Sequence, residues 1–177
     1  MNAGVLPDDI SDESGVFKSM MRKRIIHQSS KEPSSADQDW LDLGHLAQVE
    51  ITSEDAGHPI ESALTAGSGP GWLAGEPGEQ TIRLLFDKPQ ALRHIQLVFE
   101  EEKRKRTQEF VLRWSGDSGR SYRDILRQQY TFSPPGATRE VEDYVVNLHG
   151  VTALELRIVP DISRGDARAS LDLLRLA

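Results

Sequence analysis

Beyond Trp40 the sequence alternates apolar and polar residues with a period of two, and this pattern restricts the fold more than any other feature. Turn-forming residues interrupt it at intervals of about eight to twelve positions, which is typical of an all-β sandwich or barrel. Successive side chains of a strand point to opposite faces, so each segment offers one apolar face. We expect about eight antiparallel strands in two sheets that enclose a single core. The clearest segments are 47–51, 81–86, 94–99 and 109–114, and later candidates are 125–132, 144–148, 154–158 and 171–176.

Two connections between these segments have a distinctive composition. Pro89 lies between two strand patterns and predicts a turn at residues 86–90, because proline lacks the donor that a strand ladder needs. Residues 100–106 form an acidic run followed directly by a basic one. This run predicts the charged tip of a hairpin with cross-strand ion pairs, in which the acidic residues cancel much of the attraction of the basic ones for phosphate.

The composition limits the classes of partner. The chain has 177 residues, enough for one domain and a tail but short for two domains. Its net charge of -7 removes the overall attraction that non-specific binding to nucleic acid or an anionic membrane would need. The absence of cysteine excludes disulfides, thiolate metal sites and a cysteine nucleophile. No secretion-signal pattern opens the sequence and no apolar stretch approaches the roughly 18 residues that span a bilayer, so we expect a cytoplasmic protein.

Residues 1–37 lack the alternation and are rich in serine, so we expect a flexible tail followed by the domain at residues 38–177. Within the tail, apolar residues at spacings of three and four predict a short amphipathic helix. A helix of this length is only marginally stable in water unless it docks. The segment is either a cationic contact for a partner or a fraying end, and the second interpretation is favoured. The apolar residues are Phe17, Met20, Met21 and Ile25.

Residues 114–125 read WSGDSGRSYRDI and resemble the strand, turn and aromatic hairpin of the discoidin domains, also called coagulation-factor type C or galactose-binding-like domains. The order of the other segments agrees, with a loop containing Gly71 and Trp72 before the central strands and two closing strands at the end. The resemblance covers residues 40–177. It implies an antiparallel jelly-roll sandwich whose loops at one end bind ligands, commonly sugars and sometimes phospholipid or protein. Intracellular relatives include the amino-terminal domain of the X-ray cross-complementing DNA-repair scaffold.

The sequence departs from this family in the long loop before the tryptophan. Many members carry an Asp-Gly there whose aspartate helps to hold calcium, whereas residues 63–67 read ALTAG. Glu54, Asp55 and Glu61 carry carboxylates in this region, but their spacing matches no calcium loop. We therefore expect no metal and no cofactor. The mostly polar loops also argue against a phospholipid ligand.

Three residues of the long loop 53–78 are candidate ligand contacts. The indole of Trp72 offers a flat apolar face for the C–H side of a sugar and an N–H for its hydroxyls, and a core position is an equally weighted role for it. His58 can donate a hydrogen bond to a ligand hydroxyl, with Glu61 beside it in the sequence. A merely exposed loop histidine is the commoner case.

Arg164 and Asp166 in the loop 160–167 are the remaining candidates. Together they can present a planar hydrogen-bonding pair to hydroxyls or carboxylates. The alternative is a solvated turn of small energetic weight.

Signals for catalysis are weak. Residues 116–119 spell GDSG, the nucleophile signature of chymotrypsin-like proteases, but no histidine has the sequence setting that this chemistry requires. The five histidines show no pair at helical spacing that would form a metal-binding face. The sequence therefore predicts a non-catalytic module that binds carbohydrate or another hydroxyl-rich ligand through its end loops. The alternative is an intracellular protein-interaction or scaffold domain with a protein partner.

Overall fold

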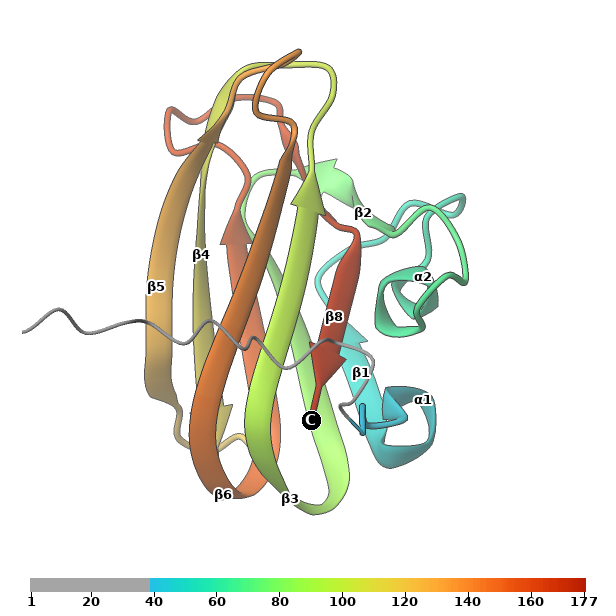
Figure 1. Cartoon of the computed structure of the whole chain (residues 1–177), viewed down its shortest axis with the longest axis vertical. Helices are drawn as coiled ribbons and strands as arrows, with labels where there is room; N and C mark the ends of the chain where they lie inside the picture. Colours follow the sequence, from blue (N-terminus) through green and yellow to red (C-terminus); the bar gives the residue numbers. More distant parts are fainter. Residues whose placement is uncertain (1–38) are drawn as a thin grey trace, which may run out of the picture. The chain divides into compact units, whose positions relative to one another are not determined.

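The structure, a computed structural model, describes residues 39–177; the predicted tail and its helix lie outside the described residues. Strands dominate this part of the chain, and the two helices are short (Figure 1). No helix among the described residues is long and apolar enough to cross a membrane. In chain order the elements are α1 (Leu43–Leu46), β1 (Ala47–Ile51), α2 (Ile60–Leu64), β2 (Trp72–Pro77), β3 (Gln80–Glu100), β4 (Arg106–Ser115), β5 (Arg123–Phe132), β6 (Arg139–Val159), β7 (Arg168–Leu171) and β8 (Leu173–Leu176).

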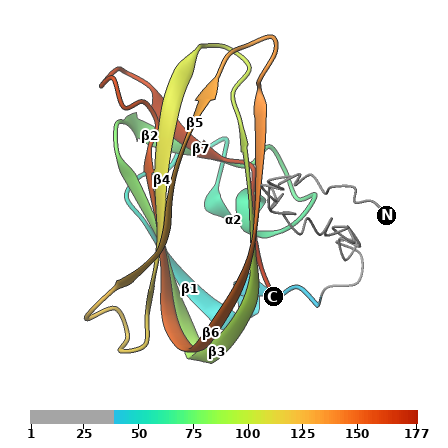
Figure 2. The ribbon, with the colours of Figure 1, turned by 60° about the vertical axis from the view of Figure 1, so that its left-hand side comes forward.

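The strands form two antiparallel layers that share their central strands. One layer has the order β1-β3-β6-β4-β5, using the first part of β3 and the last part of β6. The other layer has β8 beside the second part of β3, which pairs in turn with the first part of β6. Figure 2 shows β3 and β6 bending together at one end, with the two layers apart above the bend. β2 and β7 form a separate antiparallel pair. This confirms the predicted all-β antiparallel sandwich.

The bend corrects two predictions about where strands end. β3 runs through the expected turn at residues 86–90, although the pairing register shifts there, between Leu85 and Gln90. The missing donor of Pro89 is tolerated because the ladder is already interrupted at this point. The segments 144–148 and 154–158, which were expected to be separate strands, are both parts of β6, the strand that pairs with β3. Gly150 lies between them with φ +69°, a conformation that favours glycine.

The core lies between the layers and is built from the apolar faces that the alternation predicted. The inward residues of β3, β4 and the last part of β6 are nearly all fully buried. Aromatic rings fill its centre, with ring centroids 5.2 Å apart for Phe99 and Phe110 and 5.1 Å apart for Tyr130 and Phe132. Burial of such rings is among the largest stabilising contributions in a domain of this size.

A buried carboxylate links three strands, β3, β4 and β6, on the outer face of the larger layer. Glu155 in β6 is 0% exposed and accepts hydrogen bonds from Nε of Arg83 at 2.7 Å and from Nε of Arg113 at 3.0 Å. The ring of Tyr122 lies beneath both guanidinium groups, 6.0 and 5.2 Å from their carbons. Burial by itself would raise the pKa of Glu155, but the hydrogen bonds from Arg113 and Arg83 outweigh it and hold the pKa below its usual value.

Replacing this carboxylate tests its contribution to stability. We expect Glu155→Gln to lower the free energy of unfolding by about 2–3 kcal/mol, below the range for a fully buried pair because both arginines keep some contact with water. Glu50, an exposed partner of the same Arg83 at 3.5 Å, supplies the control, and Glu50→Gln should cost under about 1 kcal/mol. Chemical denaturation at neutral pH measures both. Equal losses in the two variants would show that Glu155 is no more than a surface ion pair.

Candidate functional site

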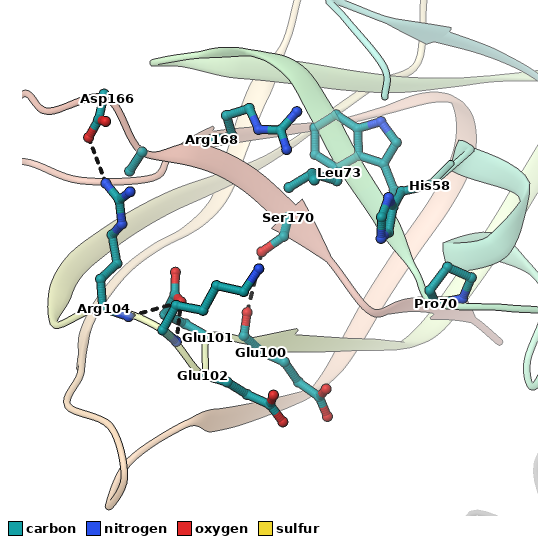
Figure 3. Close-up of a pocket in the computed structure, with 13 residues that line it drawn as sticks. His58, Pro70, Leu73, Glu100, Glu101, Glu102, Arg104, Asp166, Arg168 and Ser170 are labelled. Atoms are coloured by element: carbon teal, nitrogen blue, oxygen red, sulfur yellow. Dashed lines mark hydrogen bonds and ion pairs between the residues drawn. The ribbon is translucent and has the colours of Figure 1, made fainter. Parts of the chain in front are cut away.

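Three segments that are distant in sequence meet at one end of the sandwich and enclose an open cleft of about 380 Å³, here called the end cleft (Figure 3). The long loop and β2 form one wall, the β3–β4 connection forms a second, and the segment leading into β7 forms the third. Both loops in which the sequence placed candidate ligand contacts, 53–78 and 160–167, therefore contribute. The lining residues are His58, Pro70, Trp72, Leu73, Glu100, Glu101, Glu102, Lys103, Arg104, Asp166, Ala167, Arg168 and Ser170.

Asp55 fixes two of the polar groups that face the end cleft. One of its carboxylate oxygens lies 3.1 Å from Nδ1 of His58, and the other accepts a hydrogen bond of 3.1 Å from Nη1 of Arg168. The hydrogen bonds with His58 and Arg168, with a further one from the backbone N–H of Gly57, lower the pKa of Asp55 to about 2. The ionised carboxylate thus orients an imidazole and a guanidinium toward the same space.

Backbone hydrogen bonds join this loop to β2. The N–H of Asp55 donates to the carbonyl of Leu73 at 2.9 Å, and the N–H of Leu73 donates to the carbonyl of His58 at 3.2 Å. The carboxylate of Glu54 accepts the first N–H of α2, from Ile60, at 2.7 Å. These hydrogen bonds hold this wall of the end cleft in a fixed conformation. The loop therefore loses less conformational entropy when a ligand binds.

A second carboxylate shapes the β3–β4 connection. Glu101 accepts hydrogen bonds from the backbone N–H groups of Lys103 and Arg104, at 2.8 and 3.2 Å, and from Nε of Arg106 at 2.8 Å. Arg106 is 3% exposed and also donates to the carbonyl of Pro160, so it ties this connection to the third wall. The predicted hairpin is therefore wrong, because β3 does not pair with β4, but an ion pair between the acidic and basic parts of this run, Glu101 with Arg106, does form.

Of the five predicted ligand contacts, Trp72 has the core position, one of its two equally weighted roles, and Asp166 has a different partner from the one expected. Trp72 is 1% exposed and belongs to the hydrophobic core, so its ring has no open face for a sugar. Its Nε1–H has no acceptor among the described residues. Asp166 does line the end cleft, but it accepts a hydrogen bond of 2.6 Å from Arg104 and does not pair with Arg164. Arg164 has φ +60°, and its backbone N–H donates to the backbone carbonyl of Asp161 at 3.2 Å.

The other predictions divide between the cleft and its surroundings. His58 lines the end cleft as expected. Glu61 and Arg164 are exposed and lie outside the lining, Glu61 in the first turn of α2 and Arg164 in the loop before β7. The structure therefore brings together His58, Trp72 and Asp166 but not the remaining two.

Sequence reasoning missed Asp55 and Arg168 as a functional pair. A local signal existed for Asp55, since Asp two residues before a glycine favours a turn closed by its side chain, and its carboxylate does accept the Gly57 N–H at 3.0 Å. For Arg168 the signal was alternation, because Ala169 and Leu171 are buried while Arg168 and Ser170 point outward from β7. Neither signal indicates that the two residues meet.

The carboxylates around the end cleft do not converge on a metal position. No group of three or more histidine, aspartate or glutamate side chains among residues 39–177 is arranged to hold a metal ion. Glu54 and Asp55, which had been weighed as calcium ligands, are occupied by the Ile60 N–H and by His58 and Arg168. The residues present therefore do not fit the calcium site that the family resemblance implies.

No protein-family model and no curated protein matches the chain. Solved structures do. A family 32 carbohydrate-binding module of AlyQ, in complex with 4,5-unsaturated mannuronic acid, is similar with a TM-score of 0.58 and 13% identity, covering 79% of this chain and 98% of that chain. A pectin-binding carbohydrate-binding module has a TM-score of 0.55 and 17% identity, covering 74% and 89%. The family 32 module of Clostridium perfringens NanJ, in complex with galactose, has a TM-score of 0.54 and 10% identity, covering 73% and 92%.

These likenesses cover most of the described chain and nearly all of each similar module. They confirm the galactose-binding-like sandwich that the residues around the GDSG turn indicated. The described part of this chain has the fold of the family 32 carbohydrate-binding modules.

The role of Asp55 as an anchor can be tested by titration. Its pKa of about 2, against an ordinary value of 3.8, means that its stabilising contribution is complete above about pH 4 and is lost as the pH falls toward 2. We expect His58→Ala to raise this pKa further than Arg168→Gln does, because the His58 hydrogen bond is the larger cause. Carboxyl carbon NMR of the labelled protein measures the values. An Asp55 that titrates near pH 4 in the parent protein would contradict the assignment.

Proposed function

We propose that this protein is a non-catalytic module that binds a neutral, hydroxyl-rich carbohydrate in the end cleft. The observation that carries the proposal is the set of polar groups that Asp55 holds in one place, the imidazole of His58 and the guanidinium of Arg168, both facing an open cleft at the end of a galactose-binding-like sandwich. The similar solved module of NanJ, in complex with the neutral sugar galactose, supports it.

The chemistry of the lining suits hydroxyl groups, which both donate and accept hydrogen bonds. Arg168 and His58 supply N–H donors, and the carboxylates of the β3–β4 connection supply acceptors. The lining residues include four carboxylates against the three basic side chains of Lys103, Arg104 and Arg168. A polyanion would gain no net electrostatic attraction from such a balance, so a neutral sugar fits better.

The state of the carboxylates supports binding without catalysis. Glycoside hydrolysis uses two carboxyl groups, one on each side of the bond that breaks. Here Glu100 is paired with Arg139, Glu101 with Arg106, and Asp166 with Arg104. Among the lining carboxylates of the described residues, this leaves Glu102 without a hydrogen bond or ion pair, and a single free carboxylate does not make an acid and base pair.

A protein-interaction role is the second candidate, and one observation favours it. Val141 and Val145 of β6 are 52% and 84% exposed, and they lie two pleats apart on the same outer face of the smaller layer. Exposed apolar residues grouped on a face are common at contact surfaces. Co-purification of a partner that is lost in Val141→Ser/Val145→Ser, together with no sugar binding, would favour this role over the first.

Sugar binding by the end cleft is tested with Arg168→Gln, which removes a charged donor at the wall. We expect isothermal titration with galactose and galactosides, chosen after a glycan array, to show a loss of affinity of about tenfold, the effect of one hydrogen bond from a charged group. Arg127→Gln is the matched control, since Arg127 pairs with Glu109 on β4 away from the cleft, and it should leave the affinity unchanged. Failure of the parent protein to bind any neutral glycan on the array would overturn the proposal.

A further inference from the structure

Two strand edges of the sandwich have no neighbouring strand within residues 39–177, and they are here called the open edges. The first part of β6, residues 139–148, pairs with β3 on one side, and β4 pairs with β6 only from Ala153 onward. β5 pairs with β4 and with no other strand of the described chain. Alternate residues of such an edge direct their backbone N–H and C=O groups away from the sheet, where another strand can bind them.

The core is less well covered along the open edges than elsewhere. On β3, the inward side chains of Ile95, Leu97 and Phe99 are 0% exposed. The inward side chains of the open edges also pack against the core, but they remain partly exposed. They are Leu126, Tyr130, Tyr144, Val146 and Leu148. Covering this apolar surface with a further strand would therefore be favourable.

The open edges lie on the same side of the sandwich and face each other across the core (Figure 1). The ring centroid of Tyr130 on β5 is 5.7 Å from that of Phe99 in the smaller layer. Burial raises the pKa of Tyr130, and the negative charges of Glu142 and Glu140 on β6 raise it further. Residues 133–138 connect the two strands directly. A partner that binds at this side therefore meets both edges.

The two layers end in a step at this side. The larger layer continues past β6 with β4 and β5, whereas the smaller layer ends at the first part of β6. β5 runs in the same direction as the last part of β6, because both are antiparallel to β4. Since β6 reverses at its bend, β5 runs opposite to the first part of β6 (Figure 2). A two-fold rotation about an axis along the strands thus places β5 of each copy antiparallel to the first part of β6 of the other, and the two steps fit together.

The charges of the two open edges are complementary. Residues 123–132 carry two arginines and one aspartate, a net charge of +1, whereas residues 139–148 carry one arginine and three carboxylates, a net charge of -2. Opposite charges on neighbouring strands favour the pairing of β5 with β6 of another copy. Pairing of β6 with β6 would bring the acidic edges together.

We propose that the protein forms a symmetric dimer through its open edges, with β5 of each copy paired antiparallel to residues 139–148 of the other. The larger layer of one copy then continues into the smaller layer of the second copy, and the partly exposed side chains of the edges are covered. A single strand from another protein would occupy one edge only, whereas a second copy occupies both at once. The dimer does not depend on sugar binding, because no residue of the open edges lines the end cleft.

Cross-linking of the full-length protein tests this pairing, since the chain contains no cysteine of its own. Gln129 on β5 and Val145 on β6 are exposed, and the dimer brings each of them close to the other residue of the second copy. We expect a mixture of Gln129→Cys and Val145→Cys, treated with a short bis-maleimide, to give a product of two chains, while each variant by itself gives none. Gln48→Cys is the matched control, exposed on β1, and it should not cross-link to Val145→Cys.

Sedimentation velocity over a range of concentrations measures the affinity. We expect the parent protein to approach twice the mass of one chain as its concentration rises. Val145→Lys adds a positive charge beside the arginines of β5 in the second copy, and it should raise the dissociation constant about tenfold, because the repulsion occurs twice in a symmetric dimer. Gln48→Lys adds the same charge on β1 and should dimerise like the parent protein. Both positions are exposed, so neither lysine disturbs the core.

The remaining outcomes overturn the proposal. A protein that stays monomeric at every concentration would have no such dimer. Cross-linking of Val145→Cys to itself, or of Gln129→Cys to itself, would show that like edges meet instead of β5 and β6. A dimer whose affinity is the same in Val145→Lys and in the parent protein would have its interface elsewhere. Sugar binding by the end cleft, tested with Arg168→Gln, is a separate measurement and is unaffected by any of these results.

Discussion

The antiparallel ladder between β3 and β6 is the constraint on which the rest of the structure depends. Each strand has 21 residues, and the two pair on both sides of a common bend, so one ladder supplies central strands to both layers. The inner faces meet because the bend folds the ladder over itself, and the aromatic rings of the core fill the space between. Strands β1, β4 and β8 pair with this ladder and β5 pairs with β4, whereas β2 and β7 form a separate pair. The loops at the two ends are therefore attached to a rigid frame.

Carboxylates that each accept several hydrogen bonds hold the strands and loops of this frame together. Glu155 joins two arginines on the outer face, Glu101 shapes the β3–β4 connection, and Asp55 and Asp117 fix the loops before α2 and between β4 and β5. An ionised carboxylate has about four acceptor positions, so one side chain can hold several backbone and side-chain donors in a defined geometry. Asp55 and Asp117 therefore act as anchors that hold the neighbouring loops in place.

The fold tolerates wide divergence of sequence because its requirements are simple. Identities of 10–17% to the similar carbohydrate-binding modules accompany the same sandwich, since any apolar residue of suitable size can occupy an inward position of a strand. The loops carry no such common requirement. Residues in the loops and at the strand ends, such as Arg168 at the start of β7, can therefore differ while the fold stays the same.

Much of this architecture could be predicted from the sequence by itself. The alternation in segments such as 94–99 and 109–114 determines which face of each strand is buried, because the side-chain period of a strand is two. The candidate contacts in the loops 53–78 and 160–167 indicated where a site would be built. Only the tertiary structure decided which side chains meet. Asp55 and Arg168 are 113 residues apart, and Trp72 and Arg106 are buried by elements that are remote in sequence. Local periodicity contains no information about such long-range packing, which the bend of the central ladder and the burial of the core determine together.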